Sequence, residues 1–371
     1  MKTIITIFIS IISFSCIYAQ QKFSANGVNY TINFYDNSAC VNYVERESSS
    51  SYPNVNVLTI PDKITFEGEE FTVTEIGYGA FSLFGTKSPC TKVILPNSIK
   101  KIGRSTFSYN DKITEVVLPQ GITYISIEMF TGCTSLSRVV IPETVTIISE
   151  KAFYGCKDLT TLNIHDGISF IGYEAFRGTN IQSVKIPVAM TEICNYAFSG
   201  MMNLRSIDMP NHVTKVGTGA FSGCIRLSSI NLSDSIKIIG ESAFRGTPIR
   251  SITIPEGVNK IEGHAFQDCK GLSEVKLPNT LKYIGEEAFR NCSALSEIII
   301  PSSVTTLEFY CFSDCSSLNS IYYYAPIPGE FSPSIMNIDS HEDSPILYVP
   351  SGTVDSFKRT KLQSFKIVEM Q

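Results

Sequence analysis

The chain has 371 residues, of which 43% are apolar, and a formal net charge of −5 from 30 basic and 35 acidic residues. This length accommodates one large domain or two ordinary ones, and the apolar content allows a substantial core. Neither charge forms a long run, which argues against a nucleic acid or an anionic membrane as a partner held mainly by charge.

Residues 1–19 have the pattern of a secretory signal peptide. Lys2 gives a positive start, a mostly apolar stretch runs from Ile4 to Ile17, and Ala19 is a small residue suited to cleavage. A membrane anchor is one alternative, but it needs a run of about 20 apolar residues. Lipidation at Cys16 is another, although the usual preceding Leu is missing. We expect a secreted or outer-surface protein with no transmembrane segment after cleavage.

Phenylalanine recurs at nearly constant spacing through most of the chain. Successive rings are 22 or 23 residues apart after a first step of 26. The positions are Phe81, Phe107, Phe130, Phe153, Phe176, Phe198, Phe221, Phe244, Phe266, Phe289 and Phe312. A Pro lies 11 residues before most of them, an Ile, Val or Leu lies 5 before each, and Ala commonly lies directly before. Four columns in phase establish an internal repeat.

One unit, residues 136–156, illustrates the structure that each repeat predicts. Its β-branched residues Val139, Val140 and Ile141 indicate a short strand, in which alternation points Val139 and Ile141 inward and Val140 outward. Pro142 lacks an N–H and ends the strand. Later apolar positions turn inward on a second side, the Phe fills the middle, and a Gly lets the chain turn back. Because one unit cannot offset the entropy of its own ordering, the units must stack as a solenoid.

Both ends of the chain depart from the repeat, as expected of caps that cover the open edges of a stack. Asn26-Gly27 lies between two apolar stretches and predicts a hairpin, and residues 64–73 predict another. Residues 354–361 have the pattern of a helix. The predicted segments are a signal peptide at 1–19, an N-terminal β cap at 20–57, a solenoid of about 11 repeats at 58–325 and a C-terminal cap at 326–371.

The repeat columns resemble those of the BspA-type leucine-rich repeat proteins of bacteria. Their unit is similar to L-x-x-I-x-I-P-x-x-V-x-x-I-G-x-x-A-F-x-G-C, which Leu272 to Cys292 matches almost position by position. The resemblance covers roughly residues 55–325. It implies a curved, β-rich leucine-rich-repeat solenoid, secreted or surface-displayed, similar to adhesins that engage host matrix proteins or neighbouring cells. The family supplies no catalytic motif.

Several units depart from this pattern. His165 and Ser233 occupy the Pro position, and Met129 and Cys311 occupy the Ala position. Two units are one residue short, and both carry Thr where other units carry Cys. These departures concern local turn geometry and not the fold.

The sequence contains no recognisable catalytic motif. The four histidines belong to no H-E-x-x-H pattern, and the chain has no G-x-S-x-G pattern or Gly-rich phosphate loop. We interpret His165 as a solvated turn residue. The segment from Asp339 to Asp343, with His341, is either a weak cation site or, as we favour, a solvated loop. Nothing selects a carboxylate pair for glycoside hydrolysis. We therefore predict no enzyme, no cofactor and no metal site.

The cysteines follow the repeat. Six of the 11 lie three residues after the Phe: Cys133, Cys156, Cys224, Cys269, Cys292 and Cys315. They lack the short paired spacing of metal sites. Equivalent residues of stacked turns lie about 4.8 Å apart, beyond the Cβ separation of about 3.8 Å that a disulfide needs. We expect reduced, buried thiols that fill the inner turn.

The residue two before the Pro position points away from the core, because both of its neighbours point inward. Stacking places these residues in a column, apolar at one end and polar at its centre, which suits a protein partner better than a uniformly charged ligand. Ile94 and Ile299 belong to this column. From it we predict a binding face of Val117, Val140, Asn163, Lys185, Asp208, Asn231, Thr253, Lys276 and Tyr322.

The predicted function is adhesin-like binding by a monomer. Its partner would be an extracellular protein or glycan of the host matrix or of a neighbouring cell surface. The alternative is a structural surface spacer, or an accessory subunit without a ligand of its own. A hydrolase is a third hypothesis, which turnover of a glycan or peptide would support.

Overall fold

The computed structural model describes residues 20–42, 54–82, 88–325, 330–331, 335, 345–359, 362 and 365–370. The predicted signal peptide and the loop around His341 lie outside the described residues. The chain divides into two compact units, residues 1–163 and 164–371. Both are built from β-solenoid turns about 23 residues apart, about 12 in all, with almost no helix. The predicted fold class is confirmed.

The first unit begins with a six-stranded sheet. Its strands are β1 (Gln20–Ala25), β2 (Val28–Asn33), β3 (Ser38–Asn42), β5 (Lys63–Phe66), β6 (Glu69–Ile76) and β8 (Lys101–Ile102). The antiparallel pairs β1–β2 and β5–β6 confirm both predicted hairpins. Asn26 and Gly27 have φ of 51° and 75°, the left-handed values that a type I′ turn requires. Parallel pairing of β6 with β8 joins this sheet to the repeats.

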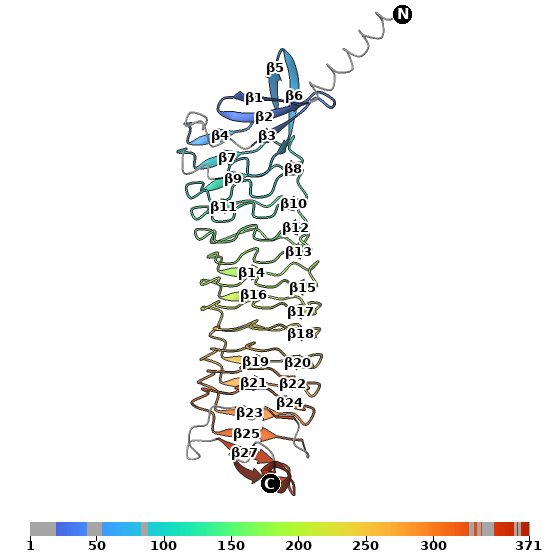
Figure 1. Cartoon of the computed structure of the whole chain (residues 1–371), viewed down its shortest axis with the longest axis vertical. Helices are drawn as coiled ribbons and strands as arrows, with labels where there is room; N and C mark the ends of the chain where they lie inside the picture. The colour runs from blue at the N-terminus through green and yellow to red at the C-terminus, as the bar shows by residue number, and fades with distance from the viewer. Residues whose placement is uncertain are drawn as a thin grey trace, which may run out of the picture. The chain divides into compact units, whose positions relative to one another are not determined.

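The repeats of the first unit carry strands on two sides (Figure 1). On the strand side, β4 (Val57–Thr59), β7 (Lys92–Ile94), β9 (Glu115–Val117) and β11 (Arg138–Val139) form a parallel sheet in register. On the second side, the shorter strands β10 (Tyr124–Ile125) and β12 (Ile147–Ile148) also pair in parallel. Val139 and Ile141 are buried and Val140 is exposed, as alternation predicts.

The second unit continues the same pattern. Its strand side holds β14 (Ser183–Lys185), β16 (Ser206–Asp208), β19 (Ser251–Thr253), β21 (Glu274–Lys276), β23 (Glu297–Ile300), β25 (Ser320–Tyr323), β27 (Ile346–Val349) and β28 (Lys366–Glu369). Its second side holds β13 (Phe170–Ile171), β15 (Glu192–Ile193), β17 (Lys215–Val216), β18 (Ile238–Ile239), β20 (Lys260–Ile261), β22 (Tyr283–Ile284), β24 (Thr306–Leu307) and β26 (Glu330–Phe331). The predicted C-terminal helix is α3 (Val354–Lys358).

The phenylalanine column forms the centre of each unit. Neighbouring rings stack with centroids 5.3 to 5.8 Å apart and planes 6° to 17° from parallel. All eleven rings are buried. The backbone makes a matching ladder, since the N–H of Phe130 donates to the carbonyl of Ala152 in the next turn at 2.8 Å. Ala precedes most of the Phe residues, and its small side chain permits this close approach; Met129 before Phe130 is an exception and is also fully buried.

From Phe107 onward, each Phe of the column lies between two left-handed backbone positions. Two residues after Phe153, Gly155 has a φ of 70°, so the expected turn at glycine is confirmed. Two residues before, Lys151 has a φ of 52°, and most other units also place a residue with a side chain there. Such conformations are rare outside glycine and asparagine. The repeat therefore imposes a backbone conformation that residue identity alone does not predict.

The two units without Pro keep the same turn by another means. The N–H of Ile168 donates to the carbonyl of His165, and the N–H of Ile236 donates to the carbonyl of Ser233. The Pro-containing turns make the same hydrogen bond from the residue three positions after the Pro. His165 Nδ1 also accepts the N–H of Gly167 at 3.3 Å, and Ser233 Oγ accepts that of Ser235 at 3.1 Å. Turns are commonly stabilised by a side chain that accepts a hydrogen bond from the backbone N–H two residues later in the sequence. His165 is thus a turn residue, as we interpreted it.

The six cysteines of the repeat column are free and buried. Each thiol donates to the main-chain carbonyl of the Phe in the preceding turn at 3.0 to 3.3 Å, as Cys156 does to Phe130. Burial raises the pKa of Cys133 to about 12 and that of Cys269 to about 11, with the remaining thiols shifted in the same direction. The thiols therefore stay protonated and act as small hydrogen-bonding core residues.

We expect these thiols to make the fold sensitive to alkali. Their pKa is higher in the folded chain than the ordinary value of 9.0, so the stability that they contribute is complete below that pH and is lost as the pH rises through the folded pKa. Melting midpoints measured from pH 7 to about 11 should fall above about pH 9. The double variant Cys269→Thr, Cys292→Thr should show a smaller fall, because Thr fills the same position in the two short units. An equal fall in both proteins would contradict this assignment.

Candidate binding face

The outward residues of the strand side lie in register within each unit. In the first unit, β7 and β9 pair Ile94 with Val117. In the second, β14 and β16 pair Lys185 with Asp208, and β19 and β21 pair Thr253 with Lys276. The nine predicted residues are exposed, except Tyr322, which is half-buried. Their predicted direction away from the core is therefore observed, while their role in binding stays a prediction.

In the first unit this surface combines an apolar stripe with paired charges. Val117 and Val140 are 38% and 57% exposed. Beside them, the carboxylate of Glu115 forms ion pairs with Lys92 at 3.0 Å and with Arg138 at 3.7 Å. A shallow hollow is lined by Ser137, Arg138, Val139, Val140, Thr161, Leu162 and Asn163. The arrangement offers apolar contact next to charges that already have partners.

Asn163 has a structural task that the sequence did not indicate. Its Oδ1 accepts the N–H of Ile141 at 2.8 Å, and its Nδ2 donates to the carbonyl of the same residue at 2.9 Å. The amide thus replaces the strand partner that β11 lacks in this turn. The turns at Asn163 and Asn231 form no strand on this side, in agreement with the weak strand propensity of Asn.

The middle of the second unit presents polar residues. Lys185 pairs with Asp166 at 2.8 Å, and Lys276 pairs with Glu274 at 3.2 Å. The hydrogen bond from Lys185 lowers the pKa of the Asp166 carboxyl. Within the described residues Asp208 makes no ion pair, and it is exposed. This stretch therefore offers one unpaired carboxylate among neutral and paired groups.

The last strands return to apolar side chains. The register aligns Ile299 with Tyr322 and Tyr322 with Tyr348. The two tyrosine rings stack with centroids 4.7 Å apart and planes 12° from parallel. The prediction missed Tyr348 because we treated its segment as a separate cap. Tyr348 nevertheless lies two residues before Pro350, so the rule that gave the rest of the column also identifies it.

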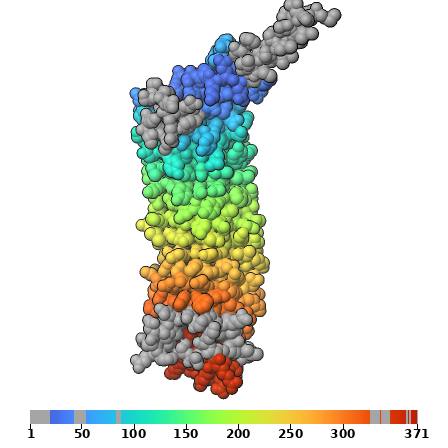
Figure 2. Space-filling view, viewed as in Figure 1, coloured from blue at the N-terminus to red at the C-terminus, as the bar shows by residue number. Residues whose placement is uncertain are grey.

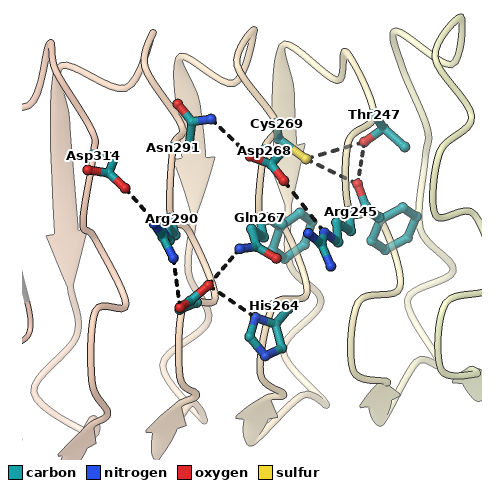
Figure 3. A network of polar contacts seen from close by, with 12 residues as sticks. Arg245, Thr247, His264, Gln267, Asp268, Cys269, Arg290, Asn291 and Asp314 are labelled. Atoms are coloured by element: carbon teal, nitrogen blue, oxygen red, sulfur yellow. Dashed lines mark hydrogen bonds and ion pairs between the residues drawn. The ribbon is translucent and has the colours of Figure 1, made fainter.

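A polar network crosses the turns of the second unit near the Phe column (Figure 3). Glu287 accepts a hydrogen bond from Arg290 at 2.9 Å and another from Gln267 at 2.6 Å, and it lies 3.5 Å from His264 Nδ1. Arg290 also binds Asp314 at 2.8 Å. These contacts tie successive turns together. The carboxylates of Glu287 and Asp314 thus face cations or amides from neighbouring turns.

In the described part of the chain, no group of three or more His, Cys, Asp or Glu lies close enough together to hold a metal ion. No described helix combines the length and the apolar character needed to cross a membrane.

Stacked turns of about 23 residues, a stacked Phe column within each unit and parallel strands with an open outward side define a leucine-rich-repeat β-solenoid. The family model described as BspA type leucine rich repeat region matches residues 58–160, 128–249 and 237–328. The chain belongs to this family. The resemblance drawn from the repeat columns is therefore confirmed.

Solved structures share this fold. A leucine rich cell surface protein from Faecalibacterium prausnitzii is 26% identical, with a TM-score of 0.62 and 94% of each chain covered. A leucine-rich repeat protein from Bacteroides ovatus is 21% identical, with a TM-score of 0.55 and 94% of this chain and 100% of that chain covered. The pneumococcal vaccine antigen PcpA is 20% identical, with a TM-score of 0.55 and 95% and 99% covered. A search among curated proteins finds no match.

Proposed function

We propose that this protein is an exported, surface-displayed binding protein that engages an extracellular protein through its strand side. The observation that carries the proposal is the outward column, which is exposed and in register within each unit. Val117 and Val140 provide apolar contact in the first unit, and Ile299 and Tyr322 provide it in the second. The polar residues of the second unit provide orientation. The cell-surface description of the Faecalibacterium structure supports the proposed location.

A binding role without catalysis fits the side chains best. The buried thiols have raised pKa values and are poor nucleophiles. The carboxylates of the polar network are engaged with cations and amides. A surface spacer is the competing function, and it differs in having no ligand of its own. Recovery of a specific partner by the mature protein from host matrix proteins or a glycan array would distinguish the two.

Two sets of substitutions test the strand side against an identified partner. The first replaces Lys185, Asp208 and Lys276 with Ala, and the second replaces Val117 and Val140 with Ser. We expect the valine pair to weaken binding by about tenfold or more, because apolar contact is lost at an interface core. The polar triple should have a smaller effect, because two of its members are already ion-paired.

Surface plasmon resonance with the identified partner measures both effects. Tyr173→Ser, an exposed residue that is not on the strand side, is the matched control. If both strand-side variants bind like the wild type while keeping its melting midpoint, the binding site lies elsewhere.

A further inference from the structure

Three arginines form a positively charged edge in the second unit, where the chain leads into the strand side. Arg205, Arg226 and Arg250 come from three successive turns, and we call them the arginine edge. Arg205 directly precedes β16 and Arg250 directly precedes β19. All three side chains are exposed. Figure 2 shows the colours of this unit following one another in chain order. Arg205 and Arg250 hold equivalent positions in their turns, and Arg226 lies two residues earlier in the turn between them.

The charge of the arginine edge is not compensated. The other arginines in the repeats of this unit each pair with a carboxylate: Arg177, Arg245 and Arg290. Among the described residues, no acidic side chain lies within ion-pair distance of Arg205, Arg226 or Arg250. The stretches that carry them, 202–206, 225–229 and 248–251, contain no Asp or Glu. In a chain with a net charge of −5, this edge is a local site of attraction for anions.

A shallow hollow gives the edge a defined geometry. Arg205, Arg226 and Ser228 line it together. Ser228 occupies the position in its turn that Arg205 occupies in the turn before. Successive turns lie about 4.8 Å apart, so two guanidinium groups and a hydroxyl face the same space. Guanidinium groups bind carboxylates through two parallel hydrogen bonds, and a carboxylate is therefore a fitting occupant.

Exposed apolar side chains run along the same edge. Met202 and Ile225 hold equivalent positions in adjacent turns and are 59% and 57% exposed. Pro248 follows at the corresponding place in the next turn. Arg and Met are both enriched at protein interfaces. An apolar strip beside uncompensated arginines suits a protein segment better than a sulfated glycan, which has little apolar surface to cover the strip.

We propose that the arginine edge binds a segment of a protein partner in which acidic residues stand next to apolar ones. Carboxylates of the segment pair with Arg205 and Arg226 in the hollow, and its apolar side chains cover Met202 and Ile225. The inference rests on the proposed binding function and adds a contact outside the predicted outward column. It also names the chemistry of the partner at that contact.

Fluorescence anisotropy with a labelled peptide of Glu-Glu-Leu repeats tests this proposal on the mature chain. Arg205→Ala with Arg226→Ala should weaken binding about tenfold or more, and Met202→Ser with Ile225→Ser about threefold or more. The matched control removes the same charge elsewhere, at the exposed Lys237 and Lys282 before β18 and β22. Lys237→Ala with Lys282→Ala should change the affinity by less than about twofold.

Three results overturn the proposal. The peptide fails to bind the wild type, the arginine variant binds like the wild type, or the lysine control loses as much affinity as the arginine variant. A different ligand class would be indicated if heparin fragments bind more tightly than the peptide and their affinity is unchanged by Met202→Ser with Ile225→Ser. That result would assign the arginine edge to a sulfated glycan. The Val117 and Val140 variants are measured with the identified partner and not with this peptide, so failure of the arginine-edge proposal is distinguishable from failure of the proposed function.

Discussion

Replacing Phe221 with Ala should destabilise the protein by about 3–5 kcal/mol, the cost typical of removing a buried aromatic ring from a packed core. Its side chain is fully buried, and its ring stacks on those of Phe198 and Phe244 with centroids 5.6 Å from each. The substitution would leave a cavity between the rings of Phe198 and Phe244. The surrounding turns cannot easily move together to fill this cavity, because backbone hydrogen bonds hold them in place. In a solenoid each turn is stabilised mainly by its neighbours, so one weakened turn also weakens the turns on both sides.

Urea denaturation followed by far-ultraviolet circular dichroism measures this loss. Phe170→Ala removes the same side chain from a position that is 46% exposed, and its effect should stay within about 0.5 kcal/mol. The contrast between the two variants isolates the contribution of the stacked column. Similar denaturation midpoints for Phe221→Ala and Phe170→Ala would show that the rings do not support the stack.

Deleting residues 326–371 should convert the protein into an aggregating species. In the intact chain β27 pairs with β25, and β28 pairs with β27, so these strands cover the last repeat. The helix residue Phe357 packs against Tyr323 with ring centroids 5.6 Å apart, and Tyr323 is only 2% exposed. The deletion would uncover both a strand edge and this apolar interior. Open edges of this kind pair with other chains.

Size-exclusion chromatography with light scattering checks the expected aggregation. A less severe pair of variants in β27 separates capping from chain length. Leu347→Asp with Val349→Asp changes the buried positions and should also cause aggregation, whereas Ile346→Asp with Tyr348→Asp changes the outward positions of the same strand and should leave a monomer. If the truncated chain stays monomeric with an unchanged melting midpoint, residues 326–371 do not act as a cap.

The periodic spacing of the sequence determined the fold class. Alternation at Val139, Val140 and Ile141 assigned the inward and outward sides correctly, because a strand has a fixed period of two. The Asn26-Gly27 pair located a hairpin, since a type I′ turn requires two residues with positive φ. The cysteine column was correctly expected to be buried, because its position follows the Phe in each turn. The proposed domain boundaries and the binding role of the outward column remain predictions.

Only the tertiary structure decided which side chains have partners, because those contacts join residues about 23 positions apart. The side chain of Asn163 satisfies the backbone of Ile141, and the pairing of Lys185 depends on Asp166 in the preceding turn. The same holds for the arginine edge: only the stacking of the turns shows that none of the described carboxylates lies within ion-pair distance of Arg205. The repeat period is a local property that the sequence carries directly. Charge pairing and left-handed turns arise from how neighbouring turns meet, and the sequence of one turn does not specify them.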